Sequence, residues 1–142
     1  MNHEAGMEHA GPHAGVPPLM AGTSLDQALY ALVLVHGRGG SAEGMLPIAR
    51  AAKATDAALV APVAVGNSWY PKRFLDPREQ NAPWLSSALA SLGAAVEQVR
   101  SAGIPSERII LVGFSQGACL TLEYATMAAQ ANVRFGGVAA LA

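Results

Sequence analysis

Continuous runs of apolar residues recur along the chain and predict the strands of a buried sheet. They stand at Tyr30–Val35, Ala58–Val63, Ile109–Val112 and Phe135–Ala142. Because these runs are apolar at nearly every position rather than at every second one, they are typical of parallel strands covered on both faces. A shorter segment, Pro17–Gly22, predicts an additional strand at an edge of the sheet.

Apolar residues recur at helical spacing between these runs. Helices are predicted at Glu43–Lys53, Leu85–Val99 and Gln116–Ala131. Ser41 precedes the first helix as a candidate N-cap, and one face of that helix collects Met45, Ile48, Ala49 and Ala52. Since strands and helices alternate, the pattern favours βαβ units, which means an α/β fold with a mostly parallel sheet between layers of helices.

Two segments break this alternation. Residues 64–83 form a long irregular stretch that carries Trp69, Tyr70 and Phe74, and these aromatic residues indicate a packed, functional loop. Residues 1–16 contain three histidines without an apolar period, which predicts a flexible tail. A metal-binding tail is the alternative for that segment, although its histidine spacing matches no compact metal site.

Composition restricts the classes of function. The 142 residues are 51% hydrophobic and 13% charged, with a net charge of −1, so they allow one domain with a sizeable core and favour neither a nucleic-acid nor an anionic-membrane partner. No apolar run approaches the roughly 18 residues of a membrane span, so we expect no stable membrane insertion. The single cysteine, Cys119, excludes an internal disulfide framework and is compatible with a cytoplasmic location.

The chemistry concentrates at the junction between the third apolar run and the helix that follows it. There the sequence is G-x-S-x-G, with Gly113 and Gly117 on either side of Ser115. A strand, a sharp turn and a helix in this order predict a nucleophile elbow that projects the Ser115 hydroxyl above the sheet. Side chains at the two glycines would collide where the strand and the helix approach each other.

A second glycine-rich turn, His36–Gly40, follows the first apolar run. The carboxyl ends of parallel strands meet at one edge of a sheet, where ligands bind. Acyl transfer through a serine needs donors for the developing oxyanion, and the backbone N–H groups of Gln116 and Arg38 are the candidates.

These stretches resemble the phospholipase/carboxylesterase family of small α/β-hydrolases, which includes the acyl-protein thioesterases. The resemblance rests on Leu32–Gly39, Gly66–Pro71 and Ile109–Ala118. It implies a serine esterase that acts on carboxylic esters or thioesters without a metal or a cofactor, with Ser115 as nucleophile and Arg38 and Gln116 at the oxyanion hole. The residues expected near the substrate are His36, Gly37, Gly39, Trp69, Tyr70 and Phe114.

One departure from the family is large. In α/β-hydrolases the triad follows the order Ser, then Asp or Glu, then His, whereas Glu123 is the only acid after Ser115 and no histidine follows it. We therefore expect residues 17–142 to form the N-terminal two-thirds of an α/β-hydrolase domain that lacks its last strands and helices. Of the residues present, His36 is expected to brace its turn, and Asp76 to be a solvated turn residue.

Two hypotheses of function follow. In the first, the chain is a carboxylic ester hydrolase that forms an acyl-enzyme on Ser115 from small acyl esters, lysophospholipids or acyl thioesters. In the second, it is a catalytically inactive fragment that acts, if at all, as a binding module or self-associates through an exposed sheet edge.

Overall fold

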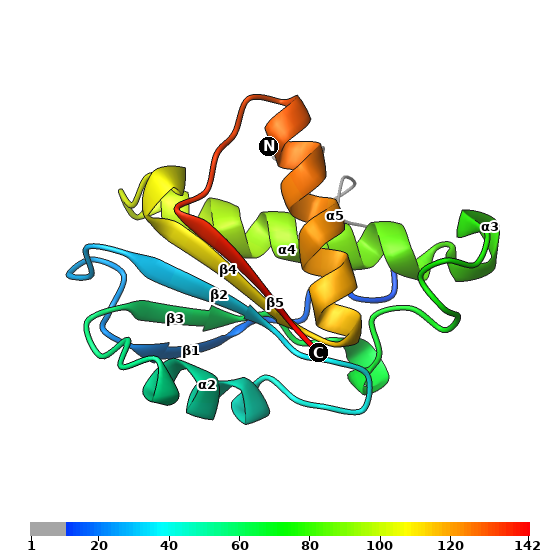
Figure 1. Ribbon diagram of the computed structural model, residues 1–142, viewed down its shortest axis with the longest axis horizontal. Coiled ribbons are helices and arrows are strands. Elements are labelled where there is room, and N and C mark those ends of the chain that lie inside the picture. The colour runs from blue at the N-terminus through cyan, green and yellow to red at the C-terminus, as the bar shows by residue number, and fades with distance from the viewer. Residues whose placement is uncertain (1–10) are drawn as a thin grey trace.

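The computed structural model describes residues 11–142 as five strands with helices on both sides of the sheet (Figure 1). The strands are β1 (Leu19–Gly22), β2 (Ala31–Val35), β3 (Ala58–Ala61), β4 (Ile109–Phe114) and β5 (Gly137–Leu141). The α-helices are α2 (Leu46–Ala51), α3 (Arg78–Asn81), α4 (Trp84–Ser101) and α5 (Gln116–Gln130). Single 3-10 turns lie at Glu43–Met45, Val65–Asn67 and Ser106–Arg108.

The strand order is β1-β3-β2-β4-β5. Strands β3, β2, β4 and β5 pair in parallel, and β1 pairs with β3 antiparallel at one edge. Both the mostly parallel sheet and the predicted edge strand before Gly22 are therefore confirmed. The two strands that end in glycine-rich turns, β2 and β4, lie side by side with Val35 opposite Gly113.

Alternate residues of each central strand face two separate cores. Val33 and Leu111 belong to the core under α4 and α5, whereas Leu34 and Val112 belong to the core under α2. Figure 1 shows α4 and α5 on one face of the sheet and α2 on the other. This is the three-layer arrangement expected of the fold, and it explains why the strands are apolar at every position.

The predicted helices are present, with one shortened. All the apolar positions expected on α4 are buried, from Leu85 to Val99. The segment at 43–53 instead begins as a 3-10 turn and becomes α-helical only at Leu46. Pro47 follows directly, and proline suits the first turn of an α-helix because it has no backbone N–H that would need an acceptor. The α-helix ends at Ala51, so Ala52 is exposed and the prediction that it faces the core is wrong.

The prediction of a flexible tail over residues 1–16 is wrong for its last part. Residues 1–10 lie outside the described residues, but residues 11–16 pack against the domain and His13 is completely buried. The reason is a set of polar partners for His13 in the loop after β3 and on α4, which a local sequence pattern does not reveal.

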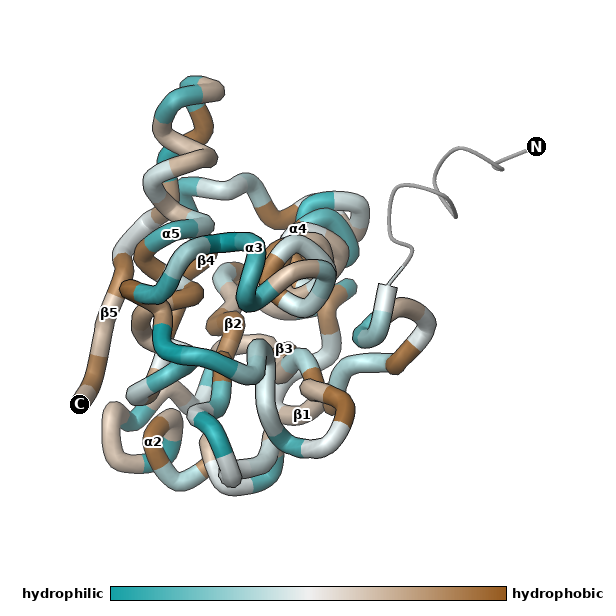
Figure 2. Tube along the Cα trace, turned by 90° about the vertical axis from the view of Figure 1, so that its right-hand side faces the viewer, coloured by the Kyte–Doolittle hydropathy of each residue, from teal (hydrophilic) through white to brown (hydrophobic). Residues whose placement is uncertain are grey.

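Strand β5 lies at the second edge of the sheet. Figure 2 places it at the margin of the molecule, and within residues 11–142 it pairs with β4 alone. Val138 and Leu141 on this strand are 41% and 36% exposed. The main-chain groups along the outer side of β5 are therefore open to a further strand.

Candidate active site

Ser115 stands at a sharp turn between β4 and α5. Its backbone has φ 57° and ψ −115°, a conformation that costs a non-glycine residue about 1–3 kcal/mol. The Ser115 N–H donates to the Leu141 carbonyl at 2.8 Å, and the Ser115 carbonyl accepts from Ala118 N–H at 2.9 Å. These bonds hold the turn while the side chain stays exposed, which is the geometry of a nucleophile elbow.

The glycines around Ser115 are required by close approach. A Cβ on Gly117 would lie 2.2 Å from the Val35 carbonyl oxygen and 2.5 Å from that of His36, so α5 begins directly against the end of β2. A Cβ on Gly113 would lie 2.3 Å from the Gly117 carbonyl oxygen. The predicted collisions are therefore present, and the one at Gly117 is with β2 rather than with the strand that enters the elbow.

The turn after β2 lies next to the elbow. A Cβ placed on Gly37 would be 3.2 Å from Ser115 Cβ and 2.8 Å from the Phe114 carbonyl oxygen. Within this turn the N–H groups of Gly39 and Gly40 donate to the carbonyls of Asn67 and Gly37, at 2.7 and 3.0 Å. The structure thus brings together the two glycine-rich turns that the sequence singled out.

The N–H groups of Arg38 and Gln116 are the proposed oxyanion donors. Within residues 11–142 neither N–H has a hydrogen-bond acceptor, in contrast to the N–H groups of Gly39 and Gly40 in the same turn. Gln116 is buried and opens α5, so the positive end of that helix lies at the same place. The two unpaired amides therefore belong to residues that line one groove with the exposed serine.

The side chains of the same two residues serve the loop after β3. Arg38 donates from its guanidinium to the carbonyls of Pro71 and Lys72, at 3.0 Å each. Gln116 Oε1 accepts from Trp69 N–H, and Gln116 Nε2 donates to the Tyr70 carbonyl, both at 2.8 Å. Each residue therefore offers a backbone donor near Ser115 and uses its side chain to hold residues 69–72.

His36 braces the turn, as the sequence predicted. The ring is 1% exposed. Its Nδ1 lies 2.8 Å from the Gly37 carbonyl oxygen, and its Nε2 lies 3.2 Å from the Ala64 nitrogen. A carbonyl can only accept and an amide N–H can only donate, so His36 is the neutral Nδ1–H tautomer. Burial lowers the pKa of the imidazole, partly offset by the bond to Gly37.

This position corrects the expectation that His36 contacts the substrate, because both ring nitrogens are occupied inside the domain. Trp69 requires the same correction. It is 0% exposed, and its Nε1–H donates to the His36 carbonyl at 2.8 Å. The indole is large and apolar apart from this one donor, so it packs in the core behind the site.

An open groove of about 780 Å³ lies over the elbow. Its lining includes Arg38, Tyr70, Arg73, Phe74, Ser115, Gln116, Cys119 and Leu141. Tyr70 belongs to this lining although only 2% of its surface is exposed. Burial raises the pKa of its phenol to about 12, so the hydroxyl stays protonated at neutral pH. Phe114 is 41% exposed beside Gly37, outside this lining. Cys119 is partly exposed and belongs to the groove lining.

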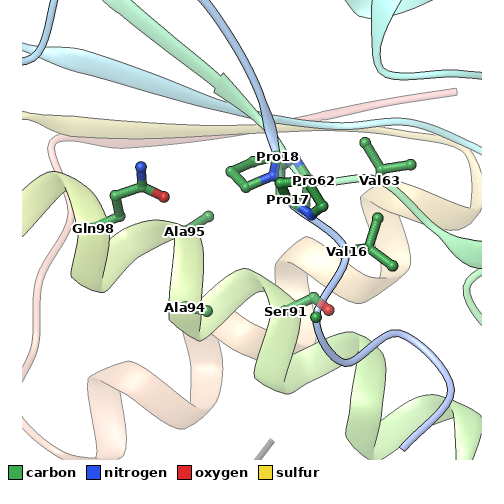
Figure 3. A pocket seen from close by; sticks show the side chains of 10 residues that line it. Val16, Pro17, Pro18, Pro62, Val63, Ser91, Ala94, Ala95 and Gln98 are labelled. Carbon is green, nitrogen blue, oxygen red and sulfur yellow. The ribbon is translucent and has the colours of Figure 1, made fainter.

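A separate cavity of about 310 Å³ lies between the N-terminal segment and α4 (Figure 3). Val16, Pro17, Pro62 and Val63 point into it from one side, and Gln98 lies on the helix opposite. It includes none of the residues that the sequence placed at the site.

Two carboxylates near the groove are paired with arginines. Asp76 accepts a 3.0 Å bond from Arg73, and this bond lowers the pKa of the Asp76 carboxyl. Its side chain is only 21% exposed, so it is less solvated than the sequence led us to expect. Glu123 pairs with Arg78. In the part of the chain that the structure describes, no group of three His, Cys, Asp or Glu side chains is arranged to hold a metal ion. No helix there is both long and apolar enough to cross a membrane.

A mostly parallel sheet between two helix layers, with a serine on an elbow at the carboxyl ends of its strands, defines an α/β-hydrolase. Within that class, the chain belongs to the Phospholipase/Carboxylesterase family, whose sequence pattern matches residues 23–142. The sequence resemblance to this family is thereby confirmed.

Solved structures agree with this assignment. The chain is 42% identical to a phospholipase/carboxylesterase from Dyadobacter fermentans, with a TM-score of 0.85, and the match covers 94% of this chain and 62% of that one. Esterase PE8 shares the fold at 24% identity and a TM-score of 0.59, over 77% of this chain and 56% of that one. A carboxylesterase from Mesorhizobium loti shares the fold at 23% identity and a TM-score of 0.55, over 82% of this chain and 57% of that one. The chain therefore spans less than two-thirds of the length of these proteins.

Proposed function

We propose that Ser115 is the nucleophile of a serine carboxylesterase or thioesterase. The observation that carries this proposal is an exposed serine on a strained elbow, in one groove with Arg38 and Gln116, whose backbone N–H groups are unpaired within residues 11–142. The family supports hydrolysis of a carboxylic ester in general. The acyl-enzyme route and the substrate class are our inference from the site.

In the proposed reaction, Ser115 Oγ attacks the acyl carbonyl carbon while its proton passes to a base. The carbonyl electron pair moves onto oxygen, and the Arg38 and Gln116 amides stabilise that oxyanion. The tetrahedral intermediate then expels the alcohol or thiol, which takes up a proton, and leaves an acyl-enzyme on Ser115. Water hydrolyses this ester and restores the serine.

The groove suits an acyl ester, because its walls combine apolar surface with few polar groups. Phe74 and Leu141 supply apolar contacts, and Tyr70 and Arg38 supply polar groups near Ser115. Small acyl esters, lysophospholipids and acyl thioesters all satisfy this chemistry. The free thiol of Cys119 is compatible with a cytoplasmic site of action, which we include in the proposal.

The described residues offer Ser115 no general base. Ser115 Oγ has no hydrogen-bond partner among residues 11–142, His36 uses both ring nitrogens elsewhere, and Glu123 pairs with Arg78. Triad members act as a unit, so without a base we expect only the rate that an oxyanion hole and binding sustain, about 10³–10⁴-fold above water. Turnover of an ester by these 142 residues should accordingly be severely reduced.

A fluorophosphonate probe tests the nucleophile directly. We expect slow covalent labelling of the chain that disappears in Ser115→Ala and persists in Ser101→Ala, which removes an exposed serine at the far end of α4. Labelling that survives in Ser115→Ala would refute the assignment of Ser115. Complete absence of labelling in the unmodified chain would favour the second candidate function.

The second candidate is a catalytically inactive module that self-associates through β5. It is favoured by one observation, the open outer edge of β5 with Val138 and Leu141 exposed. We expect multi-angle light scattering to show a mass that rises with concentration. Val138→Lys should lower that mass, whereas Leu75→Lys, at a residue 93% exposed in a loop, should not. A concentration-independent monomer would contradict this candidate.

A further inference from the structure

Trp69 joins three distant parts of the chain behind the elbow. Its backbone N–H donates to Gln116 Oε1, and its indole N–H donates to the His36 carbonyl, both at 2.8 Å. Its own carbonyl oxygen lies 2.8 Å from Nε2 of His13. All three polar groups of this buried residue are therefore satisfied, each by a different segment.

Two imidazoles lie against the indole. The His36 ring stacks on it with the centroids 5.0 Å apart, and the His13 ring meets it edge-on at 5.2 Å. The same two rings accept from successive amides of the loop after β3, because Ala64 N–H donates to His36 Nε2 and Val65 N–H donates to His13 Nδ1. The pair of histidines thus holds the loop at two places, the amides of Ala64 and Val65 and the indole of Trp69.

The two histidines carry opposite tautomers. His36 donates from Nδ1 and accepts at Nε2. His13 accepts at Nδ1, 3.0 Å from Val65 N, so its Nε2 carries the proton that it donates to the Trp69 carbonyl. His13 is therefore a neutral ring with one assigned donor and one assigned acceptor.

We propose that His13 is a positioning residue for the Ser115 site. It fixes the carbonyl of Trp69, which is the oxygen of the peptide that leads into Tyr70 on the groove wall. Trp69 N–H and the Tyr70 carbonyl in turn fix the side-chain amide of Gln116, whose backbone N–H is a proposed oxyanion donor. This inference rests on the proposed function of Ser115.

The segment that carries His13 is itself anchored. The His13 backbone N–H donates to Ser87 Oγ on α4 at 2.9 Å, and the ring lies 5.5 Å from that of Trp84. The N-terminal turn therefore transmits the position of α4 to the loop at 64–70. Displacement of an oxyanion donor by about 1 Å can reduce a rate by about 10²-fold, so small losses of this anchoring have measurable effects.

Three variants of the full chain separate the donor and the acceptor of His13. His13→Gln can place an amide N–H near the position of Nε2 and keep the bond to Trp69. His13→Asn can place an oxygen near Nδ1 and keep the bond to Val65 alone. His13→Phe keeps the ring and loses both bonds. The readouts are the rate of fluorophosphonate labelling at Ser115 and the indole N–H resonance of Trp69, assigned with Trp84→Phe.

We expect labelling to fall by about 10-fold or more in His13→Asn and His13→Phe, and to be largely rescued in His13→Gln. The Trp69 indole resonance should shift in the first two variants and stay close to the unmodified value in the third. Val99→Ala, which removes buried methyl groups at the other end of α4, is the control for lost stability. It should lower the melting temperature without changing either readout.

Equal labelling rates in His13→Phe, His13→Asn and the unmodified chain would overturn the proposal, as would a loss in Val99→Ala as large as that in His13→Phe. If the unmodified chain does not label at all, the proposed function fails and the indole resonance decides the positioning role alone. In that case, an unshifted Trp69 resonance in His13→Asn would overturn the positioning role of His13, and the expected pattern of shifts across the three variants would support that role.

Discussion

Gly117→Ala is the sharpest single perturbation of the elbow. The position lies in the first turn of α5, where an alanine would otherwise favour the helix by about 0.5–1 kcal/mol. The added Cβ would instead lie 2.2 Å from the Val35 carbonyl oxygen and 2.5 Å from that of His36. Both obstacles are backbone atoms at the end of a central strand, so neither can rotate away.

The magnitude follows from how far the backbone must move. To restore a contact of 3.0 Å, α5 and β2 must separate by about 0.8 Å. Overpacking of a well-packed interior costs about 1–3 kcal/mol, and the upper end applies here because two secondary-structure elements must shift. We therefore expect a net loss of about 3 kcal/mol, a large part of the 5–15 kcal/mol that stabilises a typical domain.

Urea unfolding monitored by tryptophan fluorescence measures this loss. With a slope of about 2 kcal/mol per M, the midpoint should fall by about 1.5 M. Gly93→Ala is the matched control, because it makes the same substitution inside α4 and its Cβ would make ordinary contacts with the Tyr124 side chain, at 3.7 Å from Cε1 and 3.9 Å from the hydroxyl oxygen. That variant should gain about 0.5–1 kcal/mol. Equal midpoints for the two variants would refute the steric reasoning.

Three further predictions concern the residues around the elbow. Gln116→Met leaves the buried Trp69 N–H without its acceptor and removes one of the two donors to the Tyr70 carbonyl, which keeps its bond from Ser68 Oγ. It should cost about 1–3 kcal/mol in urea unfolding, whereas Gln98→Met, at an exposed position on α4, should cost less than about 0.5 kcal/mol. Burial lowers the pKa of His36 in the folded protein, so near and below about pH 6.5 the unfolded chain binds more protons than the folded one. The free energy of unfolding should therefore fall as the pH drops from 7.5 to 5.5. If His36→Gln shows the same slope of unfolding free energy against pH, this reasoning is wrong. Arg38→Met removes two exposed hydrogen bonds, so global stability should change by less than about 1 kcal/mol while amide hydrogen exchange at residues 72–76 accelerates. Unchanged exchange at these residues would show that the guanidinium does not hold the loop.

Much of the fold was predictable because its signals are local. The four apolar runs placed β2 to β5, the shorter segment Pro17–Gly22 placed β1, and helical spacing placed α4 and α5 to within a few residues. The elbow was predictable for the same reason, since a strand, Gly113, Ser115, Gly117 and a helix follow one another within a dozen residues. The exposure of Ser115 and its positive φ agree with that prediction.

The supporting network was not predictable, because each of its bonds joins residues far apart in the chain. His13 and Trp69 are separated by 56 positions, and Trp69 and Gln116 by 47. His13 stands in a segment rich in glycine and proline, whose composition indicates flexibility and does not reveal the distant polar partners of the buried histidine. Trp69 and His36 were expected at the substrate for a related reason: sequence proximity to a site does not reveal on which side of the loop a ring packs.

The sequence by itself determined which residue is the candidate nucleophile, which backbone N–H groups are the candidate oxyanion donors, and which class of sheet carries them. These properties depend on neighbours in the chain and on the periods of helix and strand. Only the tertiary structure decided what holds the site in place. Pairing β2 beside β4 brings Gly37 against Ser115, and packing the N-terminal turn on α4 brings His13 to Trp69. Those contacts exist because buried polar groups must find partners, and the folded chain alone determines which partners are within reach.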